Sequence, residues 1–205
     1  MSASKHLPSH LETEHLLLRP LREDDLDFFI GLHGDREVIR FLGGTGEPRT
    51  PEATEAWLAK MIRWYSDDAL GPYALVRRSD DSLVGRSGLS IFEIEKTPSS
   101  ADGIPIATWG IESADPGVPV VSLLELGYVV HPSAWGEGFA TEASRAWLAF
   151  AFEERHEQIV HSVIAPGNAP SLRVAQKNGL SKAGTDVRMD GSTYGVFRRE
   201  RASWK

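Results

Sequence analysis

The alternation of hydrophobic and polar positions predicts a domain in which strands and helices follow one another along the chain. Its clearest stretch runs from Val121 to Phe152, where a run of β-branched and aliphatic residues gives way to a helical period. Residues 121–131 are short and apolar enough to form a strand. From Phe139 onward, apolar residues fall on one stripe and charged residues lie away from it. We therefore predict a strand, a turn and a helix here.

The turn between these two elements carries glycines at positions 136 and 138. Glycine adopts backbone conformations that let the chain come close to a ligand. The helix that follows presents unsatisfied amide N–H groups, and its dipole adds about half a positive charge at that end. A strand, a glycine turn and a helix N-terminus together form a common device for binding phosphate through the backbone. The stretch therefore predicts a phosphate-binding turn.

Two other phosphate-binding loops fit this turn less well. A P-loop ends in Gly-Lys-Ser or Gly-Lys-Thr, and the chain contains neither. A dinucleotide-binding turn needs a third glycine where Thr141 stands. It also needs an acidic residue about 20 positions later, where Val160 and His161 lie. A nicotinamide-binding oxidoreductase therefore remains a remote alternative.

The same patterns predict one domain over residues 11–205, preceded by a flexible polar leader at residues 1–10. Helices are expected after Arg22, over residues 50–65, from Phe139 and after Asn168. The predicted strands are residues 15–19, 73–77, 83–94, 121–131, 159–165, 185–187 and 193–199. Residues 96–120, rich in proline and glycine, are too long for a simple connection and predict an insertion. A hairpin, a lid over the site and a dimer contact are the alternatives for it.

Composition narrows the class of protein further. The 205 residues are 41% hydrophobic and include no cysteine, which fits a core-forming domain in a reducing, cytoplasmic environment. No apolar run approaches membrane length. The net charge of −7 argues against non-specific nucleic-acid binding and is compatible with a cationic substrate. The seven histidines show no metal-ligand spacing, so no metal is expected.

Two motifs give the chain a family resemblance. Residues 126–132 and 135–143 closely resemble the acetyl-CoA-binding segment of the GNAT N-acyltransferases, in particular the ribosomal-protein-alanine acetyltransferase-like (RimJ/RimL) branch. Gly138 and Ala140 match the family pattern, whereas Trp135 replaces its usual arginine or glutamine. Residues 168–180 resemble a later family motif, with asparagine, serine and a Lys-x-Gly-Leu ending. The opening, residues 11–19, is also similar to this branch, with His15 where an arginine is usual.

The resemblance implies an α/β (α+β) fold of the GNAT type, with a mixed, mostly antiparallel sheet of about seven strands flanked by helices. It implies an acetyl-CoA-dependent N-acetyltransferase acting by direct attack on a primary amine. A non-catalytic acyl-CoA-binding or sensing module is the alternative. The cofactor residues it implies are Tyr128, Val129, Val130, Trp135, Gly136, Glu137, Gly138, Phe139, Ala140, Thr141, Asn168 and Ser171.

Glu125 is the first candidate for the general base. It lies among apolar residues of the predicted strand, where burial raises the pKa of a carboxyl toward neutrality. Alternation places it on the strand face shared by Leu123 and Val129. A salt-bridged strand carboxylate is the alternative. Glu93 is the reserve candidate, and His131, which precedes a proline, is expected to be structural.

The acid that protonates the departing thiolate is expected to be Ser171. Many family members use a tyrosine in the helix after the asparagine motif, and the matching position here is Ala175. In the RimJ/RimL branch the motif serine is the usual substitute, so the resemblance points to Ser171. A serine that only completes the helix cap is the alternative.

The acceptor amine is left open between a protein N-terminus and small molecules such as an amino acid, a polyamine or an aminoglycoside. The glycine-rich residues 43–46 line its site or form a plain connector. The aromatic residues Trp57, Trp64 and Tyr65 contact it or pack in the core. A homodimer is a guess based on the family, and no nucleic-acid or membrane partner is expected.

Overall fold

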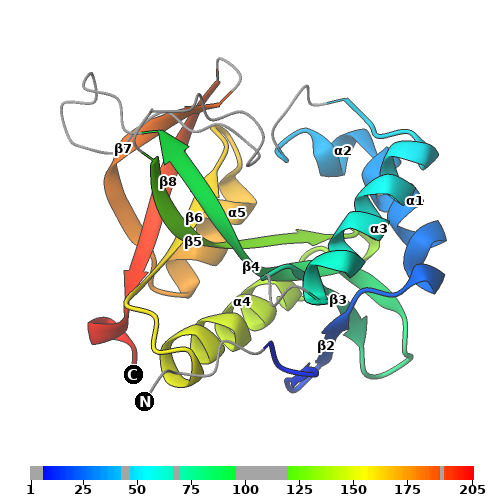
Figure 1. The fold of residues 1–205 in the computed structure, drawn as a ribbon, viewed down its shortest axis with the longest axis horizontal. Coiled ribbons are helices and arrows are strands. Elements are labelled where there is room, and N and C mark those ends of the chain that lie inside the picture. Colours follow the sequence, from blue (N-terminus) through cyan, green and yellow to red (C-terminus); the bar gives the residue numbers. More distant parts are fainter. Residues whose placement is uncertain (1–6, 43–46, 67–69, 96–119, 190–191) are drawn as a thin grey trace.

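Within the described residues, eight strands form one central sheet with helices on both of its faces (Figure 1). The computed structural model describes residues 7–42, 47–66, 70–95, 120–189 and 192–205. The strands are β1 (Leu11–Glu12), β2 (Leu16–Pro20), β3 (Pro72–Arg77), β4 (Leu83–Glu95), β5 (Val120–Val130), β6 (Ile159–Ile164), β7 (Ser181–Met189) and β8 (Ser192–Glu200). The α-helices are α1 (Leu26–Gly34), α2 (Arg36–Ile39), α3 (Pro51–Ser66), α4 (Phe139–Ala149) and α5 (Ala169–Lys177). The predicted fold class is confirmed, and the extra strand is the two-residue β1 paired with β2.

The sheet opens at one point, between β5 and β6. Its strand order is β1-β2-β3-β4-β5-β6-β8-β7, and every neighbouring pair is antiparallel except β5 and β6. These two run parallel and are in register only where Glu125 lies opposite His161. One residue further on, the Ser162 hydroxyl donates to the Leu126 carbonyl at 2.8 Å, so a side chain links the strands there. Beyond that point β5 continues along β4 without β6 beside it.

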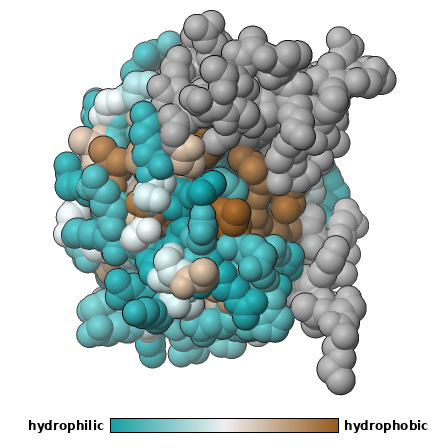
Figure 2. All heavy atoms as spheres, turned by 90° about the vertical axis from the view of Figure 1, so that its left-hand side faces the viewer, coloured by the Kyte–Doolittle hydropathy of each residue, from teal (hydrophilic) through white to brown (hydrophobic). Residues whose placement is uncertain are grey.

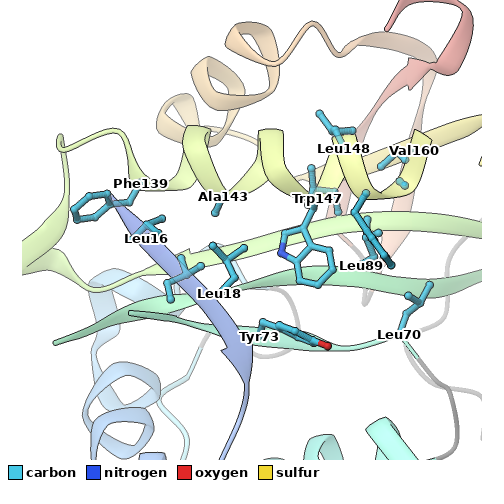
Figure 3. Packing of buried hydrophobic residues seen from close by; sticks show 14 of the residues in the cluster. Leu16, Leu18, Leu70, Tyr73, Leu89, Phe139, Ala143, Trp147, Leu148 and Val160 are labelled. Atoms are coloured by element: carbon cyan, nitrogen blue, oxygen red, sulfur yellow. The ribbon is translucent and has the colours of Figure 1, made fainter. Parts of the chain in front are cut away.

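One face of the sheet packs against α4. Leu16 and Leu18 from β2 meet Phe139, Ala143 and Trp147 from α4 in the main core cluster (Figure 3). The Trp147 ring is fully buried. It also meets the ring of Tyr73, from β3, edge to face at 4.9 Å between centroids. Buried aromatic pairs of this kind stabilise a core beyond the area that they bury, by roughly 1 kcal/mol.

The other face packs against α1 and α3. Phe29 and Leu32 from α1 join Leu58 from α3 over Ala74 and Val129 of the sheet. Since successive residues of a strand point to opposite faces, Ala74 lies on this face and its neighbour Tyr73 on the face of α4. The alternating side chains of the strands therefore pack against helices on both faces of the sheet.

Local sequence signals set the ends of several elements. The Thr50 hydroxyl accepts from the Ala53 amide at 3.2 Å, and Pro51 opens α3 as expected of a first-turn proline. The acidic helix start after Arg22 forms a 3₁₀ turn, Glu23–Asp25, and α1 follows it. Asp25 is buried there because Arg19 pairs with both of its carboxylate oxygens.

The predicted hairpins are confirmed. β3 and β4 are joined through residues 79–81, and β7 and β8 form the closing pair. Within the predicted leader, Leu7 packs against the main core and the Pro8 carbonyl accepts from the Tyr73 hydroxyl at 2.6 Å. The part of the leader next to the domain is thus anchored to it. The predicted insertion at residues 96–120 lies outside the described residues except for Val120, which begins β5.

The side of the molecule formed by β7 and β8 presents a mostly hydrophilic surface. Figure 2 shows this side, which is the left-hand side of Figure 1, with a small group of hydrophobic residues near its centre.

Candidate functional site

A cavity of about 460 Å³ lies beside the C-terminal half of β5. Its walls come from β5, the glycine turn, the start of α4, one side of α5, and α2 with the residues after it. Every residue predicted to bind the cofactor lines this cavity except Glu137. The lining residues among them are Tyr128, Val129, Val130, Trp135, Gly136, Gly138, Phe139, Ala140, Thr141, Asn168 and Ser171. The structure thus brings both predicted motifs to one cavity.

The glycine turn provides backbone amides that can bind an anion. Gly136 and Gly138 have φ values of 87° and 88°, in the left-handed region that favours glycine. Gly138 is the N-cap of α4, and its carbonyl accepts from the amides of Thr141 and Glu142 at 2.9 and 3.0 Å. The amides of residues 136–140 precede this first turn of helical hydrogen bonds. They lie at the positive end of the helix dipole, where a phosphate binds favourably.

Three cationic side chains line the same cavity, and one of them, Arg40, is paired at 3.1 Å with Glu37, which also lines it. Arg40 follows α2, and Arg173 and Lys177 lie on α5. Sequence reasoning assigned them no role, although Arg173 and Lys177 stand four positions apart and therefore share one face of the helix. The one acidic residue of the turn, Glu137, pairs with Arg77 at 3.1 Å, which offsets its charge. The cavity is therefore suited to a ligand with several phosphate groups.

β5 presents backbone groups to the cavity as a free edge. The His131 amide donates to the Val84 carbonyl at 2.8 Å, which extends the ladder between β5 and β4. Because hydrogen bonding alternates along an antiparallel pair, the backbone of Val129 also faces β4, while that of Tyr128 and Val130 faces the opening left by β6. The indole N–H of Trp135 donates to the Val130 carbonyl at 2.7 Å. This hydrogen bond holds the half-exposed Trp135 side chain at the end of the free edge.

Ser171 is hydrogen-bonded to the side chain of Tyr128. The two hydroxyl oxygens are 2.7 Å apart, and the Tyr128 hydroxyl also donates to the Ser171 carbonyl at 3.1 Å. Asn168 caps α5 by accepting from the Ser171 amide at 3.1 Å. Burial raises the pKa of Tyr128 to about 12, although the Ser171 hydroxyl acts in the opposite direction. The Tyr128 hydroxyl therefore stays protonated. The sequence had indicated only its backbone.

Glu125 lies at the point where β5 and β6 separate. It is 8% exposed and stands opposite Ser90 of β4 and His161 of β6. Burial raises the pKa of Glu125 to about 7. The Val163 amide, the charge of Arg86 and the Ser90 hydroxyl oppose this rise. A carboxyl with such a pKa exchanges a proton readily near neutral pH.

The described residues do not favour either of the other predicted candidates for the general base, Glu93 and His131. The side chain of Glu93 lies outside the described residues. His131 caps the 3₁₀ turn Pro132–Ala134 by accepting from the Ser133 amide, as expected of a structural histidine. His161 is a further titratable residue beside Glu125, and its Nδ1 is buried with no hydrogen-bond partner.

All three aromatic residues of α3 pack against the core cluster around Phe29: Trp57, Trp64 and Tyr65. The Tyr65 hydroxyl donates to the Pro72 carbonyl. Trp57 also meets the Phe29 ring edge to face at 5.3 Å between centroids and contacts His33 and two arginines. Residues 43–46 lie outside the described residues. In the described part of the chain, no group of three or more His, Asp or Glu side chains could hold a metal ion. No helix there is long and apolar enough to cross a membrane.

Comparisons with known proteins agree with this geometry. A family model described as an acetyltransferase (GNAT) domain matches residues 15–181. The uncharacterized protein YkkB of Bacillus subtilis is 37% identical over 191 residues, which cover 93% of this chain and 95% of that protein. A solved GNAT-family acetyltransferase from Bacillus anthracis superposes with a TM-score of 0.70 at 18% identity, over 95% of this chain and 99% of that one. A RimL ribosomal-protein alpha-N-acetyltransferase in complex with coenzyme A gives a TM-score of 0.68 at 14% identity, over 93% and 97%.

Proposed function

The chain belongs to the acetyltransferase (GNAT) family, and we propose that it transfers an acetyl group from acetyl-CoA to a primary amine within a ternary complex. The observation that carries this proposal is the position of Glu125. A buried carboxyl with a pKa of about 7 lies where the sheet opens. Glu125 does not line the cavity itself, but it belongs to β5, the same strand whose residues 128–130 do.

The cavity fits the expected co-substrate. The amides of residues 136–140, with Arg173 and Lys177, would hold its phosphate groups. On the free edge of β5, the backbone of Tyr128 and the Val130 amide would hydrogen-bond the amide groups of the pantetheine arm, as a peptide adds to a sheet edge, while the Val130 carbonyl accepts from Trp135. When bound, acetyl-CoA supplies an activated thioester carbonyl.

Glu125 is proposed as the general base. The acceptor must lose a proton before its nitrogen can form the new C–N bond, and Glu125 would take that proton directly or through a water molecule. For an α-amine, with a pKa of about 8, deprotonation at neutral pH costs only about 1 kcal/mol. For a lysine side chain it costs about 4–5 kcal/mol. A single carboxyl of near-neutral pKa therefore suits an α-amine better.

Ser171 and Tyr128 are proposed as the proton donors. As the C–S bond breaks, the sulfur of the departing thiolate needs a proton. The Ser171 hydroxyl lines the cavity and is hydrogen-bonded to the Tyr128 hydroxyl, whose raised pKa keeps it protonated. The Tyr128 hydroxyl donates to the Ser171 carbonyl. After Ser171 has given its proton, the Tyr128 hydroxyl can turn to the Ser171 oxygen, 2.7 Å away, and replace that proton. The chain has no cysteine, which supports direct attack rather than a thiol acyl-enzyme.

Within the family, we assign the chain to the RimJ/RimL branch. The matching segments at residues 126–143 and 168–180, together with the structural likeness to a RimL enzyme, support this assignment. That enzyme acts on the α-amine of a ribosomal protein, according to its name. For this chain an α-amine acceptor is supported by the single base, and a cytoplasmic homodimer remains a proposal based on the family.

Release of coenzyme A thiol from acetyl-CoA tests the function. The purified protein is screened against peptides with free N-termini and against small amines. We expect turnover on at least one acceptor and a large loss of turnover in Glu125→Gln and in Ser171→Ala. Acetyl-CoA binding without turnover on any acceptor would favour a sensing module. If acetyl-CoA does not bind at all, the proposal is wrong.

A further inference from the structure

A cluster of cationic and aromatic side chains lies between α1, α3 and β4. The guanidinium carbons of Arg86 and Arg49 are 5.1 and 5.8 Å from the centre of the Trp57 ring. The His33 ring meets Trp57 edge to face at 4.6 Å between centroids, and the Arg49 amide donates to the His33 carbonyl at 3.0 Å. The Trp57 ring thus lies within cation–π distance of two positive charges.

This cluster lies on the same face of the sheet as Glu125. In the ladder between β4 and β5, Arg86 is opposite Val129 and Ser90 is opposite Glu125. Directly opposite residues share a face, and positions that differ by four residues along a strand share it as well. Val129 packs against α1 and α3, which identifies that face. The positive charge of Arg86 also acts on the Glu125 carboxyl. The cluster therefore borders the proposed base.

Nothing in the described part of the chain neutralises the two arginines through an ion pair. Among these residues neither guanidinium forms an ion pair, and the Arg86 Nε is buried without a hydrogen-bond partner. Glu125 acts on Arg86 only through its charge. His33 offers no charge, because burial and the two arginines lower its pKa to about 3. Both of its ring nitrogens are also buried without partners. Arg86 is half-buried and Arg49 exposed. A half-buried cation without an ion pair has a desolvation cost that an anionic ligand would offset.

From this cluster we infer that the acceptor amine carries a carboxylate, which Arg49 and Arg86 bind while the amine faces Glu125. The inference rests on the proposed function and narrows its substrate. Guanidinium groups bind carboxylates through paired charge-assisted hydrogen bonds, and Trp57 holds both in place. The field at this site is positive although the whole chain carries −7, so polyamines and aminoglycosides are disfavoured here.

The carboxylate can be the α-carboxylate of a free amino acid or the side chain of an acidic N-terminal residue. Matched acceptors separate the two sources. Free amino acids are compared with their amides, and peptides beginning with aspartate or glutamate with those beginning with asparagine or glutamine. We expect kcat/KM to be at least about tenfold higher for the charged member of one pair, the difference expected of a charge-assisted hydrogen bond. Equal rates within both pairs, or faster turnover of spermidine, would overturn the inference.

Variants assign the preference to the cluster. Arg49→Met removes the exposed cation and is expected to reduce the ratio between charged and neutral acceptors about tenfold. Arg49→Lys should keep part of that ratio. Arg145→Met, on the exposed side of α4, is the matched control and should leave the ratio unchanged. Arg86→Lys keeps the half-buried charge but loses the paired donors of the guanidinium, so it should reduce the ratio in part, as Arg49→Lys does. A ratio that persists in Arg49→Met and in Arg86→Lys would contradict the assignment.

The failure of this inference differs from the failure of the proposed function. If acceptors turn over without a carboxylate preference, only the inference is wrong. If no acceptor turns over, binding decides it: an N-acetylated amino acid and its amide are titrated into the protein saturated with coenzyme A. We expect the carboxylate compound to bind at least about tenfold more tightly, and Arg49→Met to abolish the difference. Equal binding of the two compounds would overturn the inference.

Discussion

Glu125, the proposed base, shows how the position of a residue in a strand can change the pKa of its carboxyl. The residue is an ordinary glutamate, but β5 buries it where the neighbouring strand departs. Burial disfavours the charged form of the carboxyl. Hydrogen bonds with the Val163 amide and the Ser90 hydroxyl partly stabilise that charged form. The two effects together leave its pKa near 7. The same glutamate on an exposed face would be ionised at every physiological pH and too weak a base.

The first prediction concerns the pH dependence of turnover. Since the unprotonated carboxylate is the active form, kcat/KM should rise with pH and level off above an apparent pKa of about 7. Glu125→Gln should lower kcat/KM by roughly 10²–10⁴-fold and remove this rising limb. Glu154→Gln, at an exposed site, is the control and should keep the limb. A limb that survives in Glu125→Gln would assign the titration to another group, with His161 the nearest candidate.

The second prediction concerns stability. The Glu125 pKa is about 7 in the folded protein and 4.5 as its reference value. Between these pH values the folded state holds a proton that the unfolded chain has lost. This contribution to stability is therefore complete below pH 4.5 and is lost as pH rises through 7. Glu125→Gln has no carboxyl to ionise, so it does not lose this contribution. Between pH 5 and pH 8 the free energy of unfolding of the variant should therefore rise by roughly 2–3 kcal/mol relative to that of the wild type. Urea denaturation at both pH values measures the change, and a constant difference would contradict the raised pKa.

The third prediction concerns the two hydroxyls. Tyr128→Phe and Ser171→Ala should each lower kcat about tenfold or more. Because the hydroxyls are 2.7 Å apart and act as one donor, the double variant should lose little more than either single variant. The KM for acetyl-CoA should change little, since the backbone of both residues is retained. Independent, multiplicative losses would show that the two groups do not act together.

At the scale of elements, the turn before α4 depends on the backbone conformation of its glycines. A Cβ added at Gly138 would meet nothing within 4 Å, so the requirement comes from its φ of 88° rather than from space. We predict that Gly138→Ala costs about 1–2 kcal/mol of stability and weakens acetyl-CoA binding, because the amides of the turn are displaced. Gly31→Ala, within α1 and also in open space, is the matched control and should stabilise by up to about 1 kcal/mol. Thermal unfolding and calorimetric titration with acetyl-CoA measure both effects. Unchanged binding in Gly138→Ala would mean that the turn does not hold the phosphates.

The elements that the sequence predicted well are those with local signals. The change of period after Val121 and the two glycines predicted β5 and α4 closely, and Thr50 and Pro51 marked the start of α3. The opening between β5 and β6 could not be predicted in this way. It depends on how β6 returns beside Glu125, which is a property of the whole sheet.

The candidate site was likewise predictable only where its residues lie close together in the sequence. Most of the predicted cofactor residues fall in two short runs, 128–130 and 135–141, so motif and cavity coincide there except at Glu137. The contact between Tyr128 and Ser171 joins residues 43 positions apart, and the cluster around Trp57 draws on α1, α3 and β4. Their residue types are common, and no spacing along the chain marks them. Only tertiary packing brings them together.

At the scale of the molecule, the open sheet edge connects the two sides of the reaction. β5 has its Tyr128 side chain toward α5 and its Glu125 side chain toward the face of α1 and α3. A group lying in the opening would therefore have the proposed proton donor on one face and the proposed proton acceptor on the other. Direct transfer between two bound substrates requires this arrangement, because one proton must leave the amine while another reaches the sulfur.

The last prediction tests this arrangement through the stability of the whole protein. A ligand that binds only the folded state stabilises it by about 2.7 kcal/mol at a hundred times its dissociation constant. Acetyl-CoA should therefore raise the Tm, whereas NADH at equal concentration should not, since Thr141 replaces the third glycine of a dinucleotide turn. Replacing Arg173 and Lys177 by glutamine should reduce the shift and its dependence on salt, because both side chains line the cavity. Arg145→Gln, on α4 but exposed, should leave the shift intact. A larger Tm shift with NADH than with acetyl-CoA would reassign the cavity to a nicotinamide cofactor.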